Sequence, residues 1–126
     1  ILTCVINNFF FFLSSVYLVK IDVILPCSSK KKDNLTHEVF DWKKNYDKEV
    51  FLYVKGKHYN NGKTGQDEDF KNRVDFFEDQ LQFGNASIRI KKTKLTDSGI
   101  YRIKVKGKKY NELNVTMVDA KLGLIP

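Results

Sequence analysis

Short runs in which apolar and polar residues alternate recur along most of the chain. In the clearest run, Tyr101, Ile103 and Val105 alternate with Arg102 and Lys104. A period of two is typical of a β-strand with one face in the core and the other in water. Comparable runs occupy residues 16–20, 23–27, 39–44, 49–54, 73–77, 86–90 and 113–118. No run keeps a helical period for longer than one turn, so the pattern predicts an all-β domain, either a sandwich or a barrel.

The segments between these runs have the composition of turns and loops. Residues 55–69 contain Gly62 and Gly65, and glycine adopts the positive φ that tight turns require. A chain of 126 residues is long enough for one compact domain and too short for two. We expect the domain to occupy residues 16–119, with residues 120–126 as a tail that leads toward a further domain.

Residues 1–15 differ from the rest of the chain because they are largely apolar. The run at residues 9–13 fits the apolar region of a signal peptide, but a basic leader and a cleavage site of small residues are missing from this sequence. The run is also too short to span a bilayer. Two interpretations stay open: a remnant of a signal peptide, or an artefact of the gene model in which a pyrimidine-rich splice-acceptor tract has been translated.

The chain is basic, with 22 Lys and Arg against 15 Asp and Glu and a net charge of +7. Such a balance permits binding to acidic partners such as glycans or nucleic acid. Lysines also keep the exposed faces and edges of β-proteins soluble, and this second interpretation is favoured. We therefore expect no nucleic-acid partner, and polyanion binding stays an alternative.

The sequence contains no recognisable set of catalytic residues. His37 and His58 have no nucleophile pattern beside them, and residues 62–65 lack the spacing of a phosphate-binding loop. Residues 67–69 are acidic and are expected to form a solvated loop. The two cysteines belong to no Cys/His cluster of the kind that binds metals. We expect neither a cofactor nor a metal, and the protein is predicted not to be an enzyme.

Three N-glycosylation sequons point to the secretory pathway. They begin at Asn34, Asn85 and Asn114. Such sequons are acceptors only in chains that enter this pathway, and three of them in so short a chain favour it. We expect the protein on the extracellular side of the plasma membrane, or secreted.

Three further features fall on one template. Cys27 ends the second run, Trp42 lies in the middle of the third, and Asp97, Gly99 and Tyr101 form an Asp-x-Gly-x-Tyr motif that leads into a later run. This combination resembles the immunoglobulin V-set domain, in which the tryptophan packs on an inter-sheet disulfide and the tyrosine forms the tyrosine corner. The resemblance implies a sandwich of two antiparallel sheets with about nine strands.

Residues 73–101 narrow the resemblance. Arg73 precedes a short apolar stretch, and Gly-Asn-Ala-Ser then leads an alternating strand into the Asp-x-Gly-x-Tyr motif. The run is similar to butyrophilin-type co-stimulatory and co-inhibitory ligands of T cells, including myelin-oligodendrocyte glycoprotein and the V-set domain-containing T-cell activation inhibitor. In such a domain Arg73 and Asp97 would form a charge pair, and Gly99 would let the backbone turn where a Cβ atom would clash. Tyr101 would bury its ring and direct its hydroxyl to a backbone partner.

V-set domains carry a second cysteine two residues after the corner tyrosine, and this chain has Ile103 there. We expect Ile103 to fill the core beside Trp42, so that the usual disulfide between strands B and F is lacking. Cys27 is then expected to be a buried free thiol. A disulfide between Cys27 and Cys4 is the alternative.

The resemblance also implies a partner-binding face. Related V-set ligands use the outward side of one sheet to engage receptors on T cells, and the residues expected there form a basic face with exposed aromatics. They are Asp41, Lys43, Phe51, Tyr53, Arg102 and Lys104. Tyrosine and arginine dominate contact energies in interfaces. The hypothesis is a membrane-tethered immune regulator that binds a lymphocyte surface receptor and modulates T-cell activation. A homophilic or heterophilic adhesion module is the alternative, and weak self-association is compatible with both.

Overall fold

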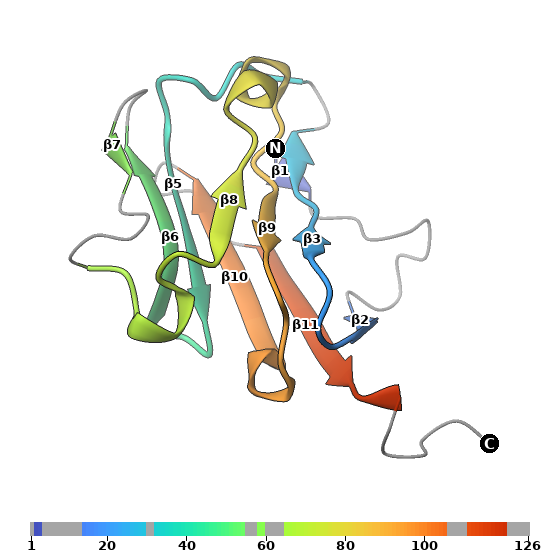
Figure 1. Cartoon of the computed structure of the whole chain (residues 1–126). Coiled ribbons are helices and arrows are strands. Elements are labelled where there is room, and N and C mark those ends of the chain that lie inside the picture. Colours follow the sequence, from blue (N-terminus) through green and yellow to red (C-terminus); the bar gives the residue numbers. More distant parts are fainter. Residues whose placement is uncertain are drawn as a thin grey trace.

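Two β-sheets make up the domain. The computed structural model describes residues 2–3, 14–29, 32–54, 58–59, 65–105 and 111–120 (Figure 1). One sheet has six strands in the order β2–β11–β10–β5–β6–β7, and the other has three in the order β3–β9–β8. Neighbouring strands pair in antiparallel fashion except β2 and β11, which are parallel.

The strand and helix bounds are as follows. The six-stranded sheet contains β2 (Ser14–Leu18), β5 (Val39–Lys44), β6 (Lys48–Val54), β7 (His58–Tyr59), β10 (Gly99–Val105) and β11 (Asn111–Val118). The three-stranded sheet contains β3 (Val23–Leu25), β8 (Val74–Phe76) and β9 (Ile88–Ile90). A short pair joins β1 (Leu2–Thr3) to β4 (Ser28–Ser29), and three 3-10 helices follow as η1 (Glu68–Phe70), η2 (Glu78–Phe83) and η3 (Leu95–Asp97).

The core lies between the two sheets and is built by the alternating residues. Ile103 on β10 and Ile88 on β9 are both fully buried, as the period of two predicts for inward positions. Trp42 on β5 is buried as well, and its indole Nε1 donates a hydrogen bond of 2.9 Å to the carbonyl oxygen of Ala86. Because Ala86 leads into β9, this bond joins the two sheets and satisfies the one polar atom that the indole brings into the core.

The sequence pattern predicted most of this architecture. All eight alternating runs overlap strands, and the all-β, two-sheet V-set class is confirmed. The short strands β1, β4 and β7 were not predicted, because two residues are too few to show a period. The domain boundary predicted at residue 16 falls inside β2, since Ser14 and Ser15 already pair with β11.

Candidate binding face on the six-stranded sheet

The corner that precedes β10 holds a buried ion pair. The Arg73 guanidinium contacts both carboxylate oxygens of Asp97, with Nη1 at 3.2 Å from Oδ1 and Nη2 bonded to Oδ2. The backbone N–H of Lys94 also donates to Asp97 Oδ2, at 3.0 Å. The Asp97 side chain is only 1% exposed, so its charge depends on these partners. The predicted Arg73–Asp97 pair is confirmed, and it is bidentate.

Tyr101 completes this corner. Its ring is buried, and its hydroxyl donates to the carbonyl oxygen of Asp97 at 2.5 Å. Burial raises the pKa of Tyr101 above its ordinary value, and the nearby Asp97 carboxylate adds to the rise. The phenol therefore keeps the proton that it donates, and the predicted tyrosine corner is confirmed.

Gly99 lies where the chain enters β10 at a φ of +158°. A Cβ atom there would come within 2.8 Å of Asn45 Oδ1 and 2.9 Å of Lys44 Cε. Asn45 Oδ1 is itself held in place, since it accepts a 3.0 Å bond from the backbone N–H of Ile100. A side chain at position 99 would therefore clash with Asn45 and Lys44, as predicted from the need for glycine at this position.

Lys44 is a buried residue of this region that sequence reasoning missed. It is the last residue of β5 and points inward, where its Nζ donates to the carbonyl oxygen of Thr96 and lies 5.9 Å from the centre of the Phe70 ring. Burial lowers the pKa of Lys44, and the Asp97 carboxylate partly opposes this shift. The sequence indicates its burial only by its position on β5, two residues after Trp42, so that both side chains lie on the inward side of the strand.

Ile103 occupies the position of the missing cysteine. It pairs across the sheet with Trp42, and both side chains are fully buried. The absence of a disulfide between β3 and β10 is therefore as predicted. Packing of the isoleucine fills the space instead.

The prediction of a free thiol at Cys27 is wrong. Cys27 is buried and disulfide-bonded, and the chain's only other cysteine, Cys4, lies outside the described residues. The physical reason is the pairing of β1 with β4, in which Thr3 lies opposite Ser28. This register brings the N-terminal segment alongside the residue that follows Cys27, which the alternating pattern could not show.

The outer face of the six-stranded sheet is the side turned away from the core. Here Arg102 on β10 forms an ion pair with Glu112 on β11, with Nη2 at 2.5 Å from Oε2. The Arg102 guanidinium also lies over the ring of Tyr46, 3.8 Å from its centre. Lys43 lies opposite Arg102 on β5, and Lys104 lies opposite Asp41. The structure therefore brings together Asp41, Lys43, Arg102 and Lys104 as predicted.

Phe51 and Tyr53 do not belong to this face, and their predicted exposure is wrong. They are 0% and 1% exposed. Phe51 pairs with Trp42, and Tyr53 pairs with Phe40 and stacks on it with ring centres 5.0 Å apart. Cross-strand partners share a face, so both rings enter the core.

A change of register between Trp42 and Lys43 explains this outcome. It leaves Val50 as an extra residue on β6, so that Val50 and Phe51 are both buried although they are neighbours. On the part of β6 that follows this extra residue, the outward side chains are therefore the half-buried Leu52 and Val54.

The aromatic residue of the outer face is Tyr46 in the turn between β5 and β6, which is 61% exposed. It was not singled out from the sequence, because a turn residue has no alternation that assigns it a face. It lies beneath a guanidinium, an arrangement that is favourable for a tyrosine ring and orders both side chains.

The charges of the outer face are mixed rather than uniformly basic. Lys43 contacts Asp41 with Nζ at 4.0 Å from Oδ2. Glu49, at the start of β6, is half-buried, and burial followed by a hydrogen bond with Asp41 raises the pKa of Glu49 to about 9. This shift favours the protonated form of Glu49 beside the Asp41 carboxylate.

The three sequons lie in different surroundings. Asn34 is exposed in a loop, and its Oδ1 accepts a 2.9 Å bond from the backbone N–H of Thr36. Asn85 is half-buried beside Ser28, to which it is joined by a β-bridge. Asn114 is exposed on β11, among the outward residues of the six-stranded sheet.

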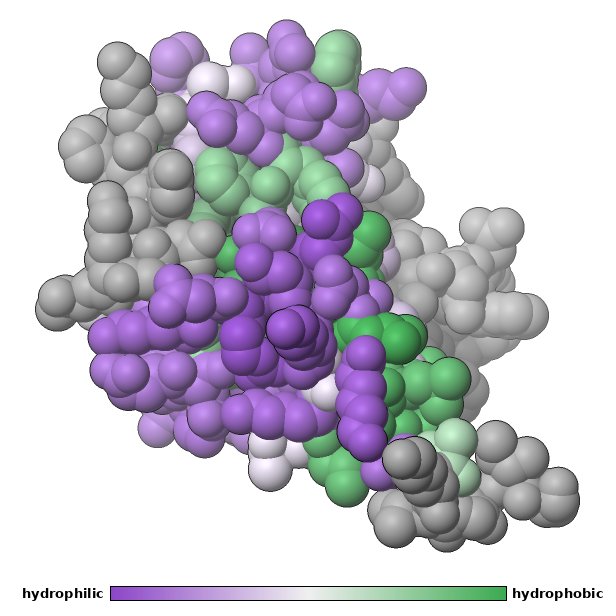
Figure 2. Space-filling view, in the orientation of Figure 1, coloured by the Kyte–Doolittle hydropathy of each residue, from purple (hydrophilic) through white to green (hydrophobic). Residues whose placement is uncertain are grey.

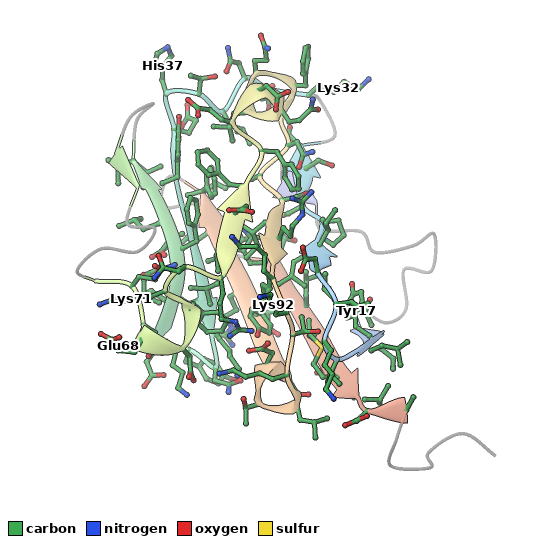
Figure 3. The ribbon with its side chains drawn as sticks, in the orientation of Figure 1. Tyr17, Lys32, His37, Glu68, Lys71 and Lys92 are labelled. Atoms are coloured by element: carbon green, nitrogen blue, oxygen red, sulfur yellow. The ribbon has the colours of Figure 1, made fainter. Side chains whose placement is uncertain are left out.

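The described residues contain no group of three or more metal-binding side chains. His37 is exposed at one end of the domain, and Figure 3 shows it far from Glu68 and Lys71 near the other end, which form an ion pair of 2.8 Å. The side chain of His58 and residues 62–64 lie outside the described part. Within that part, no helix is long and apolar enough to cross a membrane.

Comparison with family models and with known proteins identifies the family of this domain. The model of the immunoglobulin V-set domain matches residues 20–118. The chain belongs to the immunoglobulin V-set family.

Human V-set domain-containing T-cell activation inhibitor 1 is 37% identical over 81 residues, which cover 64% of this chain and 28% of that protein. The CD276 antigen homolog of Xenopus laevis is 32% identical over 83 residues, or 64% of this chain and 26% of that protein. The chain thus spans about a quarter of the length of these V-set relatives.

Solved V-set structures show the same fold. The human B7-H4 IgV-like domain has a TM-score of 0.71 and 30% identity, and the match covers 93% of this chain and 96% of that one. Bovine butyrophilin has a TM-score of 0.69 and 23% identity over 82% of this chain and 50% of its own. The predicted resemblance to butyrophilin-type T-cell regulators is confirmed. These V-set domains form a non-enzymatic family, which confirms the prediction that this domain is not an enzyme.

Proposed function

We propose that this V-set domain is the ligand-type recognition domain of an immune regulator, and that it binds a lymphocyte surface receptor through the outer face of its six-stranded sheet. The domain acts on the extracellular side of the plasma membrane, tethered in the full-length protein or secreted, and it modulates T-cell activation. The observation that carries this proposal is the match to the human B7-H4 IgV-like domain over 93% of the chain at 30% identity.

The outer face has properties that suit protein recognition. Arg102 is fixed between Glu112 and the Tyr46 ring, so little side-chain entropy is lost when a partner contacts it. Lys104 is exposed and free to steer an acidic partner, and the half-buried Leu52 adds apolar surface nearby. Arginine and tyrosine together form the kind of anchor that dominates binding energy in interfaces.

The other side of the domain carries the three-stranded sheet and faces the viewer in Figure 1. Figure 2 shows mostly hydrophilic residues on the side seen there, with hydrophobic residues gathered beside β2 and β3. Lys92 lies on this three-stranded side, in the turn that follows β9 (Figure 3). Its ammonium is exposed, which makes Lys92 a matched control for Lys104.

A binding experiment on lymphocytes tests the proposal. The glycosylated chain, tetramerised and fluorescently labelled, is applied to resting and activated T cells, and binding is read by flow cytometry. We expect a subset to bind, Lys104→Glu to lower binding at least tenfold, and Lys92→Glu to leave it unchanged.

Two results would contradict the proposal. If no lymphocyte subset binds the tetramer, the proposed lymphocyte receptor is excluded. Equal losses from Lys104→Glu and Lys92→Glu, together with full competition by heparin, would instead identify polyanion binding that depends on total charge.

A further inference from the structure

The sequon at Asn114 lies in the middle of a strand of the outer face. Leu113 and Val115 on β11 point inward and are buried, whereas Asn114 and Thr116 are exposed. The period of two therefore turns the acceptor and the hydroxyl residue of the sequon to the same outward side. A sequon displayed on a sheet face differs from the usual position in a loop.

The neighbours of Asn114 show what a glycan there would cover. Asn114 pairs with Ile100 on β10 and with Ser14 on β2, and Thr116 pairs with Val16. Val16 is 68% exposed, the most exposed of the large hydrophobic residues described. It lies on β2, the edge strand of the six-stranded sheet, and exposed apolar edges favour association between chains.

The other two sequons are placed differently. At Asn85 the hydroxyl residue Ser87 is buried, and its Oγ accepts a 2.9 Å bond from the backbone N–H of Cys27, so folding closes this sequon. Asn34 lies between Lys32 and His37, at the end of the domain where Figure 3 labels both. Asn114 is thus the sequon whose glycan would share a surface with the proposed binding residues.

We propose that Asn114 carries an N-glycan that covers the β2–β11 side of the outer face, so that a protein partner contacts the β5–β6 side. A glycan is bulky and hydrated, so it shields Val16 and Ile100 while leaving Lys43 and Leu52 accessible. The statement that a partner contacts the β5–β6 side rests on the proposed function. The statement that a glycan at Asn114 covers the β2–β11 side does not depend on any receptor.

Site occupancy is the first test. The full chain is secreted from mammalian cells, and intact glycopeptides are measured by mass spectrometry. We expect most molecules to be glycosylated at Asn114, Thr116→Ala to abolish this glycan, and Thr116→Ser to retain it. An unmodified Asn114 in secreted protein that is glycosylated at Asn34 would overturn the proposal.

Solvent footprinting tests the coverage. A photoactivated diazirine is used to label exposed side chains of the wild type, Asn114→Gln and the control Asn34→Gln. We expect labelling of Val16 and Ile100 to rise at least twofold in Asn114→Gln alone, with Leu52 unchanged. Equal labelling would overturn the covering role. If Asn114→Gln is not secreted, endoglycosidase trimming of the wild type gives the same comparison.

An added glycan tests the place of the partner. Leu52→Asn combined with Val54→Thr creates a sequon on the outward side of β6, whereas Leu52→Asn alone creates none. We expect the double variant to bind lymphocytes at least tenfold more weakly than the single variant, which carries the same Leu52→Asn change without the added glycan. Undiminished binding in a double variant that carries the added glycan would place the partner elsewhere. Occupancy and footprinting need no receptor, so a failure of the proposed function would leave those two results standing.

Discussion

Arg73 and Arg102 each bind a carboxylate, but water reaches the two ion pairs to different degrees. The Arg73 partner Asp97 is 1% exposed, whereas the Arg102 partner Glu112 is 41% exposed. Breaking a buried pair leaves an uncompensated charge without solvent, and an exposed pair can exchange its partner for water. The same chemistry therefore holds the corner together in one place and remains available for recognition in the other.

The largest expected effect comes from removing the buried charge. Asp97→Asn leaves the Arg73 guanidinium without its bidentate partner and should lower the free energy of unfolding by about 3–5 kcal/mol. Urea denaturation measures this change. The matched substitution Glu112→Gln serves as the control, and equal losses in both variants would refute the contrast between the two pairs.

Glu49 gives a prediction on the pH dependence of stability. Its pKa is raised in the folded state from 4.5 to about 9, mainly by burial. The folded chain therefore keeps a proton that the unfolded chain gives up between these pH values, so the stability from this group is full below about pH 4.5 and is lost as pH rises through 9.

Glu49→Gln imitates the protonated form at every pH. We expect it to match the wild type near pH 4 and to be more stable by about 1 kcal/mol near pH 9, after allowance for the water that reaches this half-buried group. Thermal unfolding across this range measures the difference. A parallel pH profile for both proteins would show that Glu49 ionises normally.

Tyr101→Phe sharpens the account of the corner. The ring volume is retained, but the hydrogen bond from the hydroxyl to the carbonyl oxygen of Asp97 is lost. We expect a loss of about 1 kcal/mol in the free energy of unfolding, measured by urea denaturation. A loss as large as that from Asp97→Asn would mean that the hydroxyl, rather than the ion pair, fixes the corner.

The smallest expected effect on stability belongs to the outer face. Glu112→Gln should change the free energy of unfolding by less than about 1 kcal/mol, because its pair is half exposed. The same variant removes the Glu112 carboxylate from the Arg102 guanidinium and should change lymphocyte binding more than stability. A large drop in melting temperature would show that this pair is structural.

The corner could be predicted from sequence because its signal is local. Asp97, Gly99 and Tyr101 occur at fixed spacings in one short segment, and the partner Arg73 begins a predicted strand. Each of these residue types has one stereochemical reason to be there. The placement of their side chains therefore followed from the motif.

The outer face could be predicted only in part because its composition depends on register. On β5 and β10 polar and apolar residues alternate, so Asp41 and Lys104 were placed correctly. On β6 both alternations are apolar, and a period of two does not decide between Leu52 and Phe51. The change of register opposite Trp42 makes that decision, and it is a property of two strands together.

The parallel pairing of β2 with β11 has a consequence for how the chain folds. Ser14 pairs with Asn114, so an early strand finds its neighbour 100 positions later along the chain. Contacts this distant in sequence slow folding, because a long loop must close before they form. During synthesis, the side of β2 that pairs with β11 therefore stays unpaired until β11 has left the ribosome.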